Sequence, residues 1–97
     1  MGESRAVPTV HLENERVRVT EWRFAQGAAT GWHRHEFDYV IVPLAAGTLH
    51  LDAGDKVTEA QLVAGVSYFR RAGVEHDVTN AGAGELAFVE VELKQSG

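Results

Sequence analysis

Three histidines offer the clearest chemistry in this chain, because two of them are one residue apart and the third lies in a later segment. Only Arg34 separates His33 from His35, and His76 follows a short stretch that contains glycine. Since the side chains of a strand alternate between its two faces, His33 and His35 would lie on one face of a strand. A third imidazole from a second strand would complete a set of nitrogen ligands for a divalent transition metal. The pattern therefore predicts a metal site made of three histidines.

The segments around these histidines have the pattern of short β-strands. Ten glycines interrupt the chain, and the intervals between them contain alternating or continuous apolar residues. We expect strands over residues 17–24, 39–44, 48–52, 57–63, 67–70 and 86–93, a hairpin turn at 45–47, a turn at 53–55 and a loop at 80–84. Because no segment has a sustained helical period, the fold class is expected to be all-β, a sandwich or a small barrel.

Two of the expected strands leave an alternative open. In residues 17–24 the apolar positions change face between Val19 and Trp22, which predicts either a bulge or a strand that is covered on both faces. In the final strand, Glu90 and Glu92 share a face with apolar residues. We expect that face to be solvated, and a face that lines a polar cavity is the alternative.

Single residues of the motif regions also carry expectations. Gly47, Gly65 and Gly73 are expected at turns that need a positive φ. Trp32 would point away from its histidine neighbours, so we expect it in core or interface packing.

The composition limits the class of protein. The 97 residues form one expected domain, 1–97, in which 1–8 are expected to be a flexible N-terminal segment. The absence of cysteine excludes disulfides and thiolate metal sites, and the net charge of −5 argues against nucleic acid as a partner. No apolar run approaches about 18 residues and no signal peptide is apparent, so we expect no membrane partner and a cytoplasmic location. A chain of this length buries only about 60–65% of its unfolded surface, which favours a homodimer.

The glycines and histidines together resemble the two signature motifs of the cupin superfamily, in particular its small single-domain bacterial members. The first motif reads Gly27-x5-His33-x-His35-x11-Gly47, and the second reads Gly65-x5-Arg71-x-Gly73-x2-His76-x3-Asn80. Residues 30–39 also resemble a subgroup that is associated with β-alanine degradation. The resemblance implies a double-stranded β-helix, or jelly-roll barrel, with a metal near its centre and with the three histidines as ligands.

The chain departs from the family pattern at one metal ligand. The pattern adds a glutamate four or five residues after the second histidine, where this chain has Tyr39 and Val40. Without that carboxylate a divalent ion keeps its +2 charge, and positions stay open for water, substrate or dioxygen. Either three histidines hold the ion, which could be Fe, Mn, Ni or Zn, or the site is a pocket without metal. We expect the metal, because all three histidines stand at the motif offsets.

Two residues near the histidines are candidates for binding a substrate. If Arg70 faces the cavity, its guanidinium can clamp a carboxylate through two hydrogen bonds; the alternative is an exposed arginine. Tyr39 is either a replacement for the glutamate, a hydroxyl that orients the substrate, or an aromatic residue at the barrel mouth. We therefore expect a metal-dependent enzyme, with a dioxygenase as the first candidate, that acts on a small organic acid. No catalytic residue is assigned, and the alternative is a non-catalytic module that binds or senses a small molecule.

Overall fold

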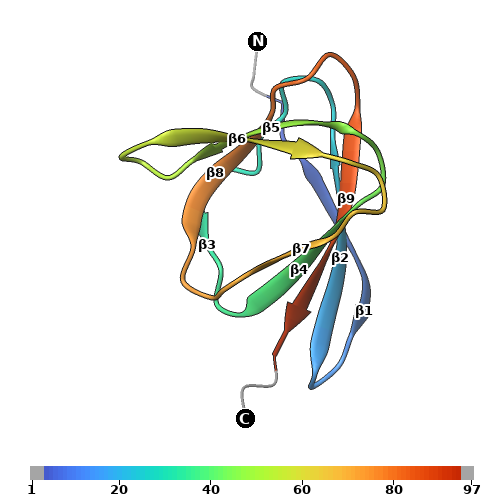
Figure 1. Cartoon of the computed structure of the whole chain (residues 1–97). Coiled ribbons are helices and arrows are strands. Elements are labelled where there is room, and N and C mark those ends of the chain that lie inside the picture. Colours follow the sequence, from blue (N-terminus) through green and yellow to red (C-terminus); the bar gives the residue numbers. More distant parts are fainter. Residues whose placement is uncertain (1–3, 95–97) are drawn as a thin grey trace.

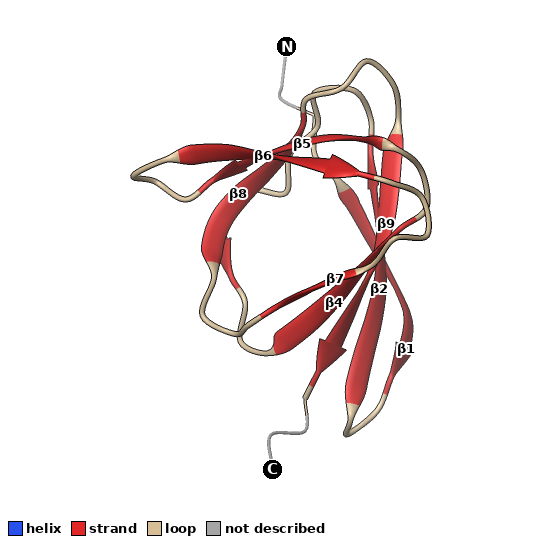
Figure 2. Cartoon of the chain, in the orientation of Figure 1, coloured by secondary structure: helices blue, strands red, loops and turns tan. Residues whose placement is uncertain are grey.

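The computed structural model describes residues 4–94, which form nine β-strands in two antiparallel sheets that face each other (Figure 1). No helix occurs within this part of the chain, as the colouring by secondary structure shows (Figure 2). The five-stranded sheet has the order β1 (Val7–Glu13), β2 (Val17–Phe24), β9 (Leu86–Leu93), β4 (Asp38–Pro43) and β7 (Tyr68–Arg70). The four-stranded sheet has the order β3 (His33–Arg34), β8 (Glu75–Asn80), β5 (Gly47–Asp52) and β6 (Val57–Leu62).

The order of the strands confirms the predicted double-stranded β-helix. From β2 to β5 each strand lies in the sheet opposite to its predecessor, and the chain crosses again from β6 to β7, to β8 and to β9. Most consecutive strands therefore lie in opposite sheets. Only β1 with β2 and β5 with β6 are hydrogen-bonded neighbours that follow each other in the chain. This arrangement is that of a jelly roll. Residues 4–94 contain no helix that is long and apolar enough to cross a membrane.

The barrel interior changes from apolar to polar along its length. On β9 the inward side chains are Leu86 and Phe88, followed by Glu90 and Glu92, and all four are buried. The packed end is centred on Phe24, whose ring centroid lies 5.4 Å from that of Phe88. Because the same strands continue past this core, its apolar packing supports the polar end where the histidines lie.

The register of β2 decides between the two alternatives for residues 17–24. The strand pairs with β9 without interruption from Val17 to Phe24, and the register shift lies instead on β1, between Val10 and Leu12. Trp22 and Phe24 point inward, whereas Val17 and Val19 lie on the outer face of the sheet. No bulge interrupts the pairing with β9, and the strand carries apolar residues on both faces, of which only the inner pair packs in the core.

Several local expectations need correction. Residues 45–47 do not close a hairpin, because β4 and β5 lie in different sheets and this segment carries the chain between them. Gly65 and Gly73 have the expected positive φ, of +78° and +100°, but Gly47 does not. The lack of a side chain at Gly47 makes room for Leu86 instead, since a β-carbon there would lie 2.1 Å from Leu86 Cδ1.

Two further expectations concern the surface and the N-terminal segment. Trp32 does not enter the core: it is 54% exposed, and a β-carbon at Gly54 would lie 3.5 Å from its ring. Of the segment 1–8, residues 1–3 lie outside the described residues. The rest makes defined contacts, because Ala6 is buried, its N–H donates to the carbonyl of Ala29 at 3.0 Å, and β1 begins at the next residue.

Candidate metal centre

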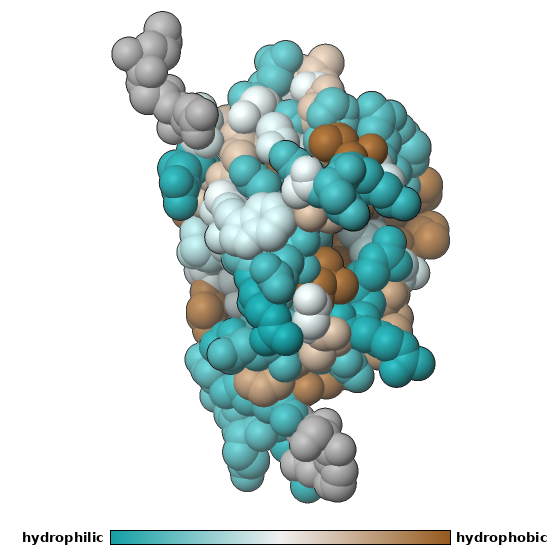
Figure 3. Space-filling model, turned by 90° about the vertical axis from the view of Figure 1, so that its left-hand side faces the viewer, coloured by the Kyte–Doolittle hydropathy of each residue, from teal (hydrophilic) through white to brown (hydrophobic). Residues whose placement is uncertain are grey.

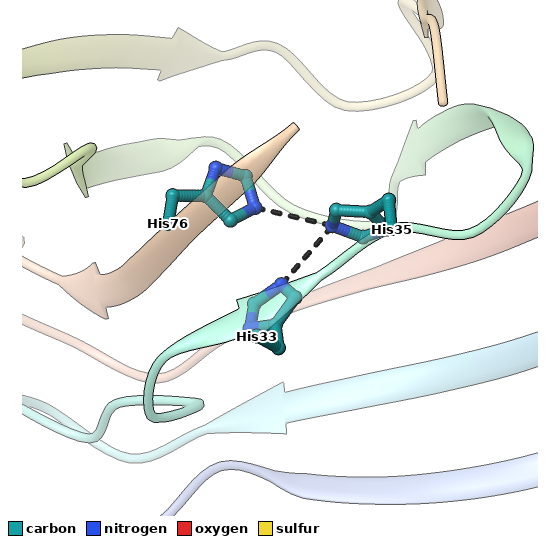
Figure 4. Close-up of side chains that lie close together, drawn as sticks. All are labelled: His33, His35 and His76. Atoms are coloured by element: carbon teal, nitrogen blue, oxygen red, sulfur yellow. Dashed lines mark hydrogen bonds between the residues drawn. The ribbon is translucent and has the colours of Figure 1, made fainter. Parts of the chain in front are cut away.

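The two motifs bring their histidines together on the inner side of the four-stranded sheet. His33 on β3 stands directly opposite His76 on β8, and His35 follows β3 immediately. The Nε2 atom of His35 lies 3.0 Å from that of His33 and 3.1 Å from that of His76 (Figure 4). Within the described residues, these three side chains form a cluster whose potential ligand atoms all lie within 4.8 Å of one another. The predicted convergence of the three rings is therefore confirmed.

The hydrogen bonds of the other ring nitrogens show that the cluster suits a cation. The Nδ1 atom of His33 lies 2.9 Å from the carbonyl oxygen of Gly31, and Nδ1 of His35 lies 3.2 Å from Oε2 of Glu90. Both partners accept hydrogen bonds, so in a neutral ring each Nδ1 carries the proton and each Nε2 presents a lone pair. With the proton on Nδ1 in both rings, neither Nε2 atom of the 3.0 Å contact has a proton to donate, and a divalent ion could accept both lone pairs. The donor set thus fits a metal bound through Nε2 atoms.

The environment of His76 keeps its imidazole in the form that binds metals. Burial, followed by the neighbouring His33 and His35, lowers the pKa of His76 to about 4, although the charge of Glu90 acts in the opposite direction. Metal ligation requires the neutral imidazole, which is thus the form present near neutral pH. His76 is available as a ligand without first losing a proton.

The opposite wall of the cavity carries two buried carboxylates, so the expectation of a solvated face for Glu90 and Glu92 was wrong. Glu90 accepts a hydrogen bond from Nε1 of Trp22 at 2.9 Å, and it contacts His35. Glu92 accepts two from Arg18, at 2.6 and 2.9 Å. Burial raises the pKa of Glu90, but the hydrogen bonds from His35 and Trp22 outweigh it and leave the pKa below its ordinary value. A charged, hydrogen-bonded Glu90 therefore faces His35, and Glu92 lines the same cavity.

Tyr39 is buried and supports one of the candidate ligands. Its ring stacks on that of His35, with the centroids 3.9 Å apart and the planes 19° apart. Burial, followed by the nearby charge of Glu90, raises the pKa of the Tyr39 hydroxyl above its usual range. Tyr39 is consequently a neutral residue whose ring is buried against His35.

Arg70 stands beside Tyr39 in the register of β4 and β7, and it lines the same cavity. The guanidinium carbon lies 4.6 Å from the centroid of the Tyr68 ring, and one of its N–H groups donates to the carbonyl of Phe69. Among residues 4–94, no carboxylate lies within ion-pair distance of Arg70. Arg70 is exposed, as in the alternative left open by the sequence, and it also lines the cavity that contains the histidines.

The space between the two walls has a volume of about 590 Å³, and side chains of both sheets line it. This volume lies within the usual range for sites that bind small molecules. Sequence reasoning had found the histidines, Tyr39 and Arg70, but it missed the roles of Glu90 and Trp22. The available signal was the pair of acids at alternate positions of an otherwise apolar strand.

The comparisons with known proteins agree with this geometry. Residues 20–92 match the model of the cupin domain family. The "Beta-alanine degradation protein BauB" of Pseudomonas aeruginosa is 59% identical over 93 residues, which cover 96% of this chain and 98% of that protein. A cupin domain from Bordetella pertussis Tohama I has a TM-score of 0.94 at 52% identity, covering 98% and 99% of the two chains. A conserved protein with a double-stranded β-helix domain from Klebsiella pneumoniae shares the fold, with a TM-score of 0.76 at 21% identity over 100% of this chain and 84% of that chain.

Proposed function

Since this chain belongs to the cupin domain family, we propose that it binds one divalent transition metal through His33, His35 and His76 and acts on a small organic acid in the adjoining cavity. The observation that carries the proposal is the convergence of three Nε2 atoms, two of them in rings whose Nδ1 is committed to an acceptor. Imidazole nitrogen suits Fe, Mn, Ni and Zn alike, so the set of ligands leaves the choice of metal open.

The proposed reaction is metal-assisted chemistry of the dioxygenase kind. When bound, a metal with three protein ligands supplies open positions at which it polarises a substrate oxygen, acidifies water or takes up dioxygen. The chain itself supplies the orientation. Arg70 clamps the carboxylate of the substrate, and the hydroxyl of Tyr39 is a neutral group that can orient it. The name of the Pseudomonas relative supports this substrate class, because β-alanine is itself a small carboxylic acid.

One observation favours a second function, that of a non-catalytic binding module. Both buried carboxylates of the cavity are already hydrogen-bonded, Glu90 to Trp22 and His35 and Glu92 to Arg18. Neither is free to act as a general base on a bound molecule. In this alternative the metal and Arg70 capture the acid without transforming it. The homodimer and the cytoplasmic location stay predictions under both functions.

Thermal unfolding in the presence of small carboxylates tests the substrate class. We expect β-alanine, propionate or malonate to raise the melting temperature of the metal-loaded protein and to leave the chelator-treated protein unchanged. Arg70→Ala should weaken the effect, whereas Arg71→Ala should not, because both arginines are exposed but only Arg70 lines the cavity. Equal stabilisation of the metal-loaded and metal-free proteins would show that the acid binds elsewhere and would contradict the proposal.

Product analysis separates the enzyme from the binding module. The carboxylate that stabilises the protein is incubated with the metal-loaded protein under air and under argon, and the solution is followed by proton NMR. The dioxygenase proposal predicts consumption of the acid under air only. Stabilisation without consumption under either gas would establish the binding module.

A further inference from the structure

The Nδ1 atoms of His35 and His33 have partners of different kinds. The Nδ1 atom of His33 is satisfied locally, by the carbonyl of Gly31 two residues earlier in the chain. The Nδ1 atom of His35 is satisfied across the barrel, by the carboxylate of Glu90 on β9 at 3.2 Å. The side chains of His35 and Glu90 are only 9% and 8% exposed. One predicted ligand is therefore held by a buried charge that belongs to the opposite sheet.

Glu90 is itself fixed in place by that sheet. Its Oε1 atom accepts a hydrogen bond from Nε1 of Trp22 on β2 at 2.9 Å, which leaves Oε2 directed at His35. Tyr39 on β4 covers one face of the His35 ring by stacking at 3.9 Å. A ring that is held at Nδ1 and on one face has little freedom to turn. Three strands of the five-stranded sheet thus determine where Nε2 of His35 points.

We propose that Glu90 is a positioning residue for the metal site. It does not bind the ion itself, but through His35 it supplies the negative charge of the carboxylate that the first motif lacks. As a carboxylate it only accepts, so it selects the tautomer of His35 with the proton on Nδ1 and leaves the Nε2 lone pair for the ion. Its negative charge, one imidazole ring away from the ion, offsets part of the +2 charge that three neutral ligands leave uncompensated. The inference rests on the proposed metal site and assigns to Glu90 a role that its strand pattern alone did not indicate.

Metal affinity of matched variants tests the inference. Glu90→Gln keeps the size and the acceptor for Trp22 but removes the charge, and its amide N–H can donate to Nδ1 and stabilise the wrong tautomer of His35. We expect Zn²⁺ affinity, measured by competition with a chromophoric chelator, to fall by about 10- to 100-fold. Glu92→Gln is the control, because Glu92 is buried on the same strand face but hydrogen-bonds to Arg18. It should bind Zn²⁺ as tightly as the parent protein.

The outcomes separate the inference from the metal site itself. If the parent protein binds no Zn²⁺, the proposed site and the inference both fail. If the parent protein binds and Glu90→Gln binds equally well, or if Glu92→Gln loses as much affinity, only the role of Glu90 fails.

A measurement on the unsubstituted protein decides the matter even if Glu90→Gln does not fold. Long-range ¹H–¹⁵N NMR of the metal-free protein at slightly alkaline pH reports which nitrogen of each histidine carries the proton. We expect His35 to be protonated on Nδ1, with Nε2 showing the shift of a bare ring nitrogen. A His35 ring protonated mainly on Nε2 would overturn the inference.

Discussion

The two sheets that face each other across the cavity contribute different chemistry. The four-stranded sheet supplies His33 and His76, with His35 directly after β3, and all three stand at motif spacing. The five-stranded sheet supplies single residues around the histidines: Glu90 from β9, which contacts His35, and Arg70 from β7, which lines the cavity. Ligand identity is therefore local in the sequence, whereas ligand orientation and the substrate surface depend on packing between sheets.

The outer faces of the two sheets also differ. On the four-stranded sheet, outward polar residues pair across β5 and β6, as in the hydrogen bonds from Thr48 to Gln61 and between His50 and Glu59. Figure 3 shows that this side of the molecule is mostly hydrophilic, with separate hydrophobic patches. Across the five-stranded sheet, register-matched apolar residues form an outer row: Leu12, Val19, Val91, Val40 and Phe69. An apolar row on one sheet alone sharpens the prediction of a homodimer.

The largest expected effect is that Val91→Lys halves the mass of the protein particle in solution. If two copies pair through the outer row, light scattering at micromolar concentration should give about twice the chain mass of 10.6 kDa. Val91→Lys at the centre of the row should give the single-chain mass, because a lysine there would be buried against a second copy. Gln61→Lys on the polar outer face is the control and should keep the larger mass. A parent protein of 10.6 kDa would contradict the dimer.

The second prediction concerns the stabilisation supplied by the metal. An ion that binds only the folded state adds about 2.7 kcal/mol to the free energy of unfolding at a hundredfold excess over its Kd. Chelator should therefore lower the melting temperature of the parent protein and leave that of His76→Ala unchanged. His50→Ala, on the exposed outer face of the same sheet, should keep the full response. Melting curves of the parent protein that coincide with and without chelator would argue against a tight site.

The third prediction concerns the contact that ties the two sheets together at the packed end. The buried side-chain amide of Asn80 on β8 donates to the carbonyls of Phe24, Ala25 and Gly84. Asn80→Ala leaves these carbonyls without that donor, and we expect a loss of about 1–3 kcal/mol in denaturant unfolding. Asn14→Ala, which removes an exposed turn contact, should cost less. Equal losses for the two variants would show that the buried amide contributes no more than a surface turn.

The smallest expected effect is that of Trp22→Phe. The phenylalanine keeps an aromatic ring in the core but removes the N–H that donates to Glu90. Loss of one such hydrogen bond should lower the free energy of unfolding by about 1–2 kcal/mol and loosen Glu90 without removing its charge. Zn²⁺ affinity should therefore fall less than in Glu90→Gln. A larger fall in Trp22→Phe would mean that the indole, and not the carboxylate, orients His35.

The comparison also explains what could be predicted from the sequence. Strand periodicity predicted the all-β class, whereas the double-stranded β-helix and the convergence of His33, His35 and His76 were predicted from the resemblance of two motifs to those of the cupin superfamily. The final strand was predicted with its correct ends, Leu86 and Leu93. The strand ends depend on neighbours in the chain, whereas the contact of His35 with His76 joins positions 41 residues apart and was predicted because both stand in recognisable motifs.

The remaining features depend on partners that are distant in the chain. Glu90 reads as a solvated residue because two acids alternate with outward valines, and its partners, Trp22 and His35, are 68 and 55 positions away. Gly47 reads as a turn residue although its lack of a side chain makes room for Leu86. Segment 45–47 has the composition of a hairpin turn, although here it carries the chain from β4 in one sheet to β5 in the other. Tertiary packing decided each of these cases, and only the two acids of the final strand left a signal in the sequence.

Metal content is the most direct test of the three-histidine site. The protein is purified without added metal or chelator, alongside a variant in which His33, His35 and His76 are all alanine, and divalent metals are quantified by mass spectrometry. We predict about one Fe, Mn, Ni or Zn ion per chain in the parent protein and only background in the variant. A metal-free parent protein that also fails to take up any of these ions when they are supplied, or a variant that keeps as much metal as the parent, would contradict the account.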